Sequence, residues 1–140
     1  MSELRRAKEL LRSGGYTCVV CKGEEIYTSE LRGVKPIADL LAGGVELCGA
    51  SAADKVVGKA TAFLYCLMGA RALYAAVISE PALRVLAEAG IAVEYDTLVP
   101  NIINRRGDGI CPFELAVLDI DDAEEAYAVI IDNMRKMNLR

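Results

Sequence analysis

Residues 54–90 read DKVVGKATAFLYCLMGARALYAAVISEPALRVLAEAG, and this stretch predicts a helix, a strand and a second helix in succession. Ser51 stands three residues before an aspartate, which is the spacing of a capping box, so we expect the first helix to start there and to run to about Gly69. The apolar residues 71–79 predict a buried strand. Residues 80–90 contain a proline at their start and a glycine at their end, as a short helix prefers.

The sequence on either side of this stretch adds a hairpin and further helices. Apolar side chains at helical spacing in residues 4–11 predict a first helix, which Gly14 and Gly15 should end. Residues 16–21 and 25–30 are rich in β-branched and aromatic side chains and predict two strands joined by a tight turn at a glycine. The other predicted elements are a helix at 36–44, an extended segment at 45–50, a strand at 92–99, a helix start at 111–120 and a last helix at 122–137.

The order of these elements predicts the fold class. Two strands separated by one helix form a right-handed parallel crossover, whereas a hairpin contributes antiparallel strands. We therefore expect an α/β fold, a three-layer α/β/α sandwich with a mixed sheet, the hairpin at one side and helices on both faces. The 140 residues contain no linker and no internal repeat, so residues 1–140 are expected to form a single domain.

Composition narrows the classes of function. The net charge of -4 argues against general nucleic-acid binding, because that affinity comes largely from cations that neutralise phosphates. The most apolar window, residues 60–70, has about half the length needed to span a bilayer, so no membrane association is expected. The N-terminus lacks the apolar stretch of a signal peptide, and we expect a cytoplasmic protein.

The cysteines and the missing histidines limit the chemistry further. Five cysteines, an odd number without regular spacing, fit a reducing compartment. Cys18 and Cys21 fall on a predicted strand, where residues three apart face opposite sides, so both are expected to pack in the core. Because histidine is absent, Ser-His-Asp triads, Cys-His dyads and His-ligated zinc are excluded. No metal and no other cofactor is expected.

Residues 58–90 resemble the cytidine-deaminase-like fold, in which a hairpin is followed by a catalytic helix, a strand and a second helix with a Val-Leu-x-Glu type sequence. In that family a His or Cys, any residue and then Glu open the first helix, and Pro-Cys-x-x-Cys opens the second. Laid over this chain, the first zinc ligand falls at Val57, the proton-shuttling carboxylate at Lys59, and the two cysteines at Ser79 and Ala82. Since no zinc ligand is retained, the resemblance supports the fold and argues against the family's reaction.

Three shorter motifs, DKVVGKA, LVPxIxNR and CPxE, are similar to those of a small bacterial group of deaminase-like proteins called Domain of Unknown Function 1893. That group brings no assigned reaction with it. The resemblance therefore implies a deaminase-like protein that lacks the zinc ligands.

Lys59 is the first candidate site residue, because it is the one charged residue in an otherwise apolar helical run. A buried ammonium must meet an anion, extend to solvent or lose its proton. One interpretation is that Lys59 points into the former catalytic cleft, where Gly58 permits close approach, and binds an anion or acts as a reactive amine. The other is a structural pair with Asp54 or Glu114.

The segment Cys111-Pro112-Phe113-Glu114 has the spacing of a capping box at the start of a helix. The helix dipole favours a thiolate at such a position, which makes Cys111 the best candidate nucleophile in the chain. The alternative is a plain helix start with no reactive role.

A polar loop precedes this helix start. Its candidate ligand-binding residues are Asn101, Asn104, Arg105 and Arg106. Guanidinium groups beside a helix N-terminus are suited to a phosphate or a carboxylate. A solvated surface turn is the alternative interpretation.

The favoured hypothesis is a zinc-free deaminase-like protein of unassigned activity that binds a small anionic ligand, such as a nucleotide or a nucleotide-derived metabolite, in the former catalytic cleft. Two alternatives stay open. One is a metal-independent enzyme that uses Cys111 or Lys59 covalently. The other is a non-catalytic interaction module, whose last helix would form a homodimer seam through Met134 and Met137. The residues expected to bind the ligand are Gly58, Lys59, Asn101, Asn104, Arg105, Arg106, Cys111 and Glu114.

Overall fold

The computed structural model describes residues 2–31, 33–103 and 107–137, which form five strands and six helices. In chain order these are α1 (Glu3–Gly14), β1 (Cys18–Lys22), β2 (Glu25–Ser29), α2 (Lys35–Ala42), β3 (Ser51–Val57), α3 (Lys59–Met68), β4 (Ala72–Ser79), α4 (Glu80–Glu88), β5 (Ala92–Val99), α5 (Pro112–Ala116) and α6 (Ala123–Met137).

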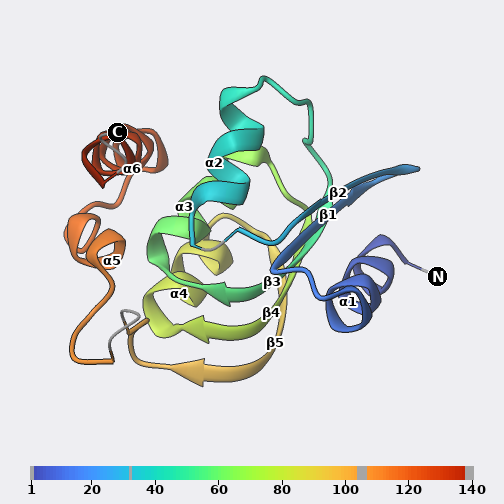
Figure 1. Cartoon of the computed structure of the whole chain (residues 1–140), viewed down its shortest axis with the longest axis horizontal. Helices are drawn as coiled ribbons and strands as arrows, with labels where there is room; N and C mark the ends of the chain where they lie inside the picture. The colour runs from blue at the N-terminus through green and yellow to red at the C-terminus, as the bar shows by residue number, and fades with distance from the viewer. Residues whose placement is uncertain (1, 32, 104–106, 138–140) are drawn as a thin grey trace.

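All five strands join one mixed sheet in the order β2-β1-β3-β4-β5 (Figure 1). The strand β1 is antiparallel to both β2 and β3, while β3, β4 and β5 run parallel to one another. The α/β class and the mixed sheet with its hairpin at one side are therefore confirmed. The hairpin turns at Gly23, whose φ of 60° lies in the left-handed region that favours glycine.

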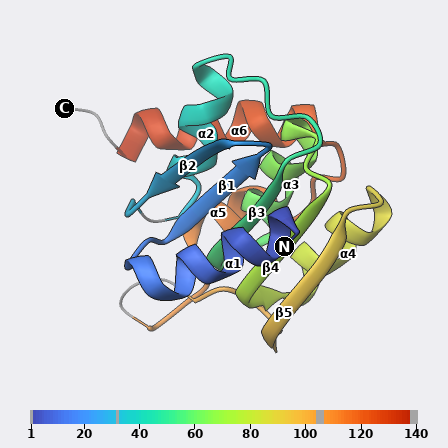
Figure 2. The same cartoon turned by 90° about the vertical axis from the view of Figure 1, so that its right-hand side faces the viewer.

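Helices cover both faces of the sheet, but unequally. The helix α1 alone lies across β1, β3 and β4 on one face, whereas α2, α3 and α4 lie on the other (Figures 1 and 2). Beyond the three layers that were expected, α5 and α6 pack on the outer side of α3. Residues of this additional layer, among them Val117, Ala126 and Ile130, belong to the same buried cluster as α3.

Two predicted elements are wrong. Residues 51–57 are not the start of a long helix but the strand β3, and residues 45–50 form a loop rather than an extended strand. The strand β3 lies at the centre of the sheet between β1 and β4, with most of its side chains buried. The capping-box spacing of Ser51 and Asp54 indicated a helix start, and periodicity alone does not separate a short strand that leads into a buried helix from the first turns of that helix.

The last helix packs against its own chain. Ala126 and Ile130 are fully buried, and Met134 is half-buried against the main core. The face that was expected to form a homodimer seam is thus largely occupied within the protomer, and a homodimer stays a prediction. None of the helices formed by the described residues has the length and apolar composition needed to cross a bilayer.

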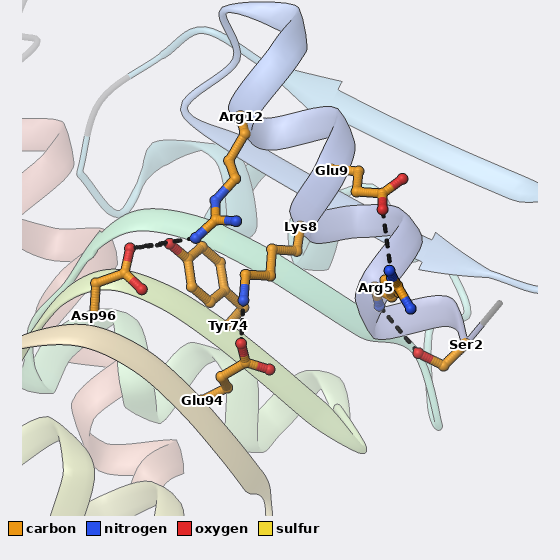
Figure 3. A network of polar contacts seen from close by, with 8 residues as sticks. All are labelled: Ser2, Arg5, Lys8, Glu9, Arg12, Tyr74, Glu94 and Asp96. Carbon is orange, nitrogen blue, oxygen red and sulfur yellow. Dashed lines mark hydrogen bonds and ion pairs between the residues drawn. The ribbon is translucent and has the colours of Figure 1, made fainter.

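Polar contacts tie α1 to the sheet (Figure 3). Lys8 forms an ion pair with Glu94, and Arg12 lies 3.7 Å from Asp96. The buried Tyr74 lies between these two pairs, and its hydroxyl donates a hydrogen bond to Asp96. The Lys8 ammonium lies 4.8 Å from the centre of the Tyr74 ring. Because ion pairs at least partly open to solvent contribute little, we expect the tyrosine hydroxyl to contribute most of the polar stabilisation.

The first prediction concerns this hydroxyl. Tyr74→Phe should lower the free energy of unfolding by about 1 kcal/mol, because a hydrogen bond to a carboxylate is lost while the ring stays packed. Urea unfolding at low and at high salt measures the loss, which should change little with salt. The matched control is Tyr95→Phe at an exposed ring, which should have almost no effect. Equal effects of the two variants would contradict the prediction.

Candidate functional site

The turn from β3 into α3 is the centre of the candidate site. Val57 is the last residue of β3, Gly58 is the N-cap, and Lys59 is the first residue of α3. The predicted helix, which began near Ser51, placed Lys59 about two turns inside it. In the structure Lys59 is instead the first residue of its helix. It stands where the backbone N–H groups of a helix have no partner within the helix. Gly58 has no side chain to cap them, so another group must do so.

That group is the carboxylate of Glu114. Its Oε1 accepts a hydrogen bond of 2.6 Å from the Lys59 N–H, and its Oε2 accepts one of 3.1 Å from the Ala60 N–H. Burial raises the pKa of Glu114 above its ordinary value, although these two N–H donors oppose the increase. A Cβ atom at Gly58 would lie 2.6 Å from Oε1, so only glycine leaves room for the carboxylate.

Glu114 therefore does not complete the predicted capping box at its own helix. Cys111 is the N-cap of α5 and a proline follows it, as expected. However, the Cys111 N–H donates to the Ile102 carbonyl at 2.9 Å, while the glutamate side chain reaches α3 instead. The spacing identified the helix start correctly and its capping partner wrongly, because a carboxylate can cap any helix start within its reach.

The Lys59 ammonium forms no ion pair with this carboxylate, although its positive charge also opposes the increase in the pKa of Glu114. It donates a hydrogen bond of 2.8 Å to the Leu118 carbonyl and lies 5.7 Å from the centre of the Phe63 ring. Within the described part of the chain no carboxylate forms an ion pair with this ammonium. The structural ion pair with Asp54 or Glu114, which was the alternative interpretation, is therefore not formed. The charge of Lys59 is thus held by a carbonyl and an aromatic ring.

The same side chain lines a cavity of about 270 Å³ between α3 and α4. Arg84 faces the cavity from α4 and, like Lys59, has no ion-pair partner among the residues described. Phe63 and Val85 contribute apolar walls. Two carboxylates, Glu88 and Asp121, complete the polar lining. The cavity can therefore contact both an anionic group and hydrogen-bond donors of a small molecule.

The other predicted site residues are only partly brought together. Asn101 is half-buried just after β5, and Cys111 is half-buried with a side chain that does not cap α5. No described contact joins Cys111 to Lys59. Asn104, Arg105 and Arg106 lie outside the described residues. The structure thus joins Gly58, Lys59 and Glu114 directly.

Sequence reasoning missed a second polar group beneath the sheet surface. Asp54 is only 6% exposed and accepts a hydrogen bond of 2.8 Å from the Tyr65 hydroxyl, which in turn lies 3.4 Å from the Cys18 sulfur. Burial raises the pKa of Asp54 to about 7. The available signal was Asp54, the one acidic residue among residues 52–57, which the predicted helix placed at a capping position instead.

The residues present do not fit the zinc of the deaminase family. The described residues contain no group of three or more His, Cys, Asp or Glu side chains that could hold a metal ion. At the positions overlaid on zinc ligands, Val57 and Ala82 have no ligating side-chain atom. The Ser79 hydroxyl already accepts a hydrogen bond from the Ala82 N–H at the start of α4.

The fold and site define an α/β protein with a mixed five-stranded sheet and a polar cavity between two of its helices. The family model described as "TM1506: Domain of unknown function (DUF1893)" matches residues 6–134, and the chain therefore belongs to the DUF1893 family. The crystal structure of a DUF1893 family protein (TM1506) from Thermotoga maritima is similar, with a TM-score of 0.87 and 33% sequence identity. The alignment covers 94% of this chain and 89% of that chain. No curated protein gives a significant match.

Proposed function

We propose that the protein is a deaminase-like domain without metal that binds a small anionic ligand in the cavity between α3 and α4. The order of elements supports the deaminase-like part of this proposal. A hairpin, a helix, a strand and a second helix follow one another as β1-β2, α2, β3 and α3, which is the order of elements in the cytidine-deaminase-like fold.

This order also changes which helices correspond. The helix that follows the hairpin is α2, so in this proposal the second helix of the family corresponds to α3 and not to α4. This assignment replaces the overlay that placed the family's motifs at Val57, Lys59, Ser79 and Ala82. The family's second motif would then fall at the start of α3, where Glu114 now accepts hydrogen bonds from two N–H groups. Because a carboxylate of the chain fills this position, we place the ligand in the adjoining cavity rather than at the helix N-terminus itself.

The observation that carries the proposal is that two cations without ion-pair partners among the described residues, Lys59 and Arg84, line one cavity. A guanidinium and an ammonium together suit a phosphate or a carboxylate. The volume of about 270 Å³ lies just below the usual range for drug-sized ligands, which favours a phosphorylated metabolite of modest size. Glu88 and Asp121 would accept hydrogen bonds from its hydroxyl or amino groups.

The test is calorimetric binding of a panel of phosphate monoesters, including nucleoside monophosphates, with the matching neutral nucleosides as comparison. Lys59→Gln removes the charge while it keeps a donor for the Leu118 carbonyl, and Arg84→Ala removes the guanidinium. Each change should weaken binding of a phosphorylated ligand by roughly tenfold or more, since a hydrogen bond to a charged group is lost.

Lys55→Ala is the matched control, because Lys55 is an exposed lysine four residues from Lys59 on the neighbouring strand. It should leave affinity unchanged. If a phosphate monoester binds and neither Lys59→Gln nor Arg84→Ala weakens it, or if the neutral nucleosides bind equally well, the proposed site is wrong.

A further inference from the structure

A second cavity, of about 450 Å³, lies between the hairpin and α2. Its walls are mainly apolar and include Val20, Tyr27, Leu31 and Leu40. Cys18 of β1 also lines it, although this residue is only 3% exposed. A cysteine, whose sulfur is the candidate nucleophile, therefore lines an apolar cavity whose volume is sufficient for a small organic molecule.

This sulfur is the end of a buried hydrogen-bonded chain. The Cys18 sulfur lies 3.4 Å from the Tyr65 hydroxyl oxygen, and the Tyr65 hydroxyl donates to Asp54 Oδ2 at 2.8 Å. The three groups come from β1, α3 and β3, and Cys18 and Asp54 are paired across the two strands. The chain thus connects the cavity wall to a carboxylate that is itself away from the cavity.

The surroundings of the carboxylate make it a proton acceptor. The charged and titratable groups that face it are Cys18 and Tyr65, and no described cation forms an ion pair with it. Its pKa of about 7, raised by burial, allows it to take up a proton near neutral pH. Burial also raises the pKa of the Cys18 thiol well above its ordinary value, so the sulfur keeps its proton until a base removes it.

We propose that this cavity binds small, mainly apolar α,β-unsaturated carbonyl compounds and that Cys18 adds to them, with Tyr65 passing the thiol proton to Asp54. As the S–H bond breaks, its proton moves to the Tyr65 oxygen while the tyrosine proton moves to Asp54. The sulfur electron pair forms a bond to the β-carbon, and the C=C π electrons move toward the carbonyl oxygen. Return of one proton to the α-carbon completes the addition of S–H across C=C, so neither an oxidant nor a reductant is consumed.

Neighbouring cysteines do not share this arrangement. Cys21 is fully buried in the separate cluster on the α1 face of the sheet. Cys48 is exposed and Cys66 half-buried, and neither is hydrogen-bonded to a tyrosine. These three thiols therefore serve as internal references for the reactivity of Cys18.

The experiment uses trans-2-hexenal as the probe on the native full chain between pH 5 and 9, with peptide mass spectrometry to follow each cysteine. The Cys18 adduct should form at a rate that saturates with hexenal concentration and rises with a midpoint near pH 7, as Asp54 ionises. Cys48 is an exposed thiol outside the hydrogen-bonded chain and provides the reference rate. Hexanol should slow the Cys18 reaction by competing for the cavity.

Two variants test the relay. Tyr65→Phe breaks it at the centre and Asp54→Asn removes the base, so each should slow the Cys18 reaction about tenfold or more at pH 7.5 and abolish the midpoint near 7. Tyr74→Phe is the matched control, because Tyr74 is a buried tyrosine on the opposite face that also donates to a carboxylate. An unchanged rate at Cys48 and an unchanged circular dichroism spectrum show that each variant is folded.

The proposal is overturned if Cys18 reacts only in denaturant, if its rate follows the pH profile of Cys48, or if Tyr65→Phe reacts as fast as Tyr74→Phe. Because Lys59 and Arg84 are intact in all these variants, the outcome is independent of anion binding between α3 and α4.

Discussion

Asp54→Asn is expected to stabilise the protein by about 3 to 4 kcal/mol at pH 8 and to change its stability little near pH 4.5. Asp54 is buried without a cationic partner among the described residues, and burial raises its pKa from 3.8 to about 7. Each unit of pKa difference between the folded and unfolded states corresponds to about 1.4 kcal/mol. At pH 8 the wild type contains a buried ionised carboxylate, which lowers the free energy of unfolding. Asparagine resembles the neutral acid at every pH, so the variant does not have this destabilising contribution.

The direction of the pH dependence follows from proton binding. Between about pH 4 and pH 7 the folded chain holds a proton on Asp54 that the unfolded chain has lost. The free energy of unfolding therefore falls as pH rises through this interval. The stabilising contribution of the neutral acid is complete below about pH 4 and is lost above pH 7. The raised pKa of Glu114 acts in the same direction.

Urea unfolding of the wild type and Asp54→Asn at several pH values from 4.5 to 8 measures this difference. The matched control is Asp119→Asn, because Asp119 is an exposed aspartate. The control should not reproduce the gain at pH 8. A variant that is less stable than the wild type at pH 8, or two parallel pH profiles, would contradict the account of a buried carboxylate without a cationic partner among the described residues.

Gly58→Ala is expected to lower the free energy of unfolding by about 2 to 3 kcal/mol. The φ of Gly58 is -99°, an angle that alanine adopts readily, so backbone strain is not the cause. The added Cβ would instead overlap the carboxylate of Glu114. Once this flexible side chain is displaced, the N–H groups of Lys59 and Ala60 lose their acceptor.

A double-mutant cycle separates this cause from others. Glu114→Ala should destabilise by a similar amount, and Gly58→Ala combined with Glu114→Ala should be no worse than either single variant, because both remove the same cap. Gly43→Ala is the control, since a Cβ there meets its nearest neighbour at an ordinary 3.4 Å. Additive losses in the double variant would mean that Gly58 is needed for a reason other than Glu114.

Much of the fold was predictable because its signals are local. The hairpin follows from β-branched strands around a glycine turn, and α4 follows from Pro81 at its start and Gly90 at its end. The strand β5 was predicted at residues 92–99, as found. The central strand β3 was not, because Ser51 and Asp54 have the spacing of a capping box, which indicated a helix start where the strand begins.

The candidate site shows the same division. Lys59, Gly58 and Glu114 were each identified by a local anomaly, namely a charge in an apolar run, a glycine beside it and a capping-box spacing. That Glu114 caps α3 rather than α5, and that Lys59 and Arg84 line one cavity, depends on how α5 and α4 pack against α3.

By itself, the sequence determined the α/β class, the hairpin, the chemistry that a chain without histidine lacks, and three residues of the candidate site. Those features depend on residue type and on spacing along a few turns or strands. Only the tertiary structure decided that residues 51–57 form the central strand and that Cys18, Tyr65 and Asp54 join in one buried chain. Hydrogen bonds and close packing between distant segments depend on where whole elements meet, and local periodicity does not determine that.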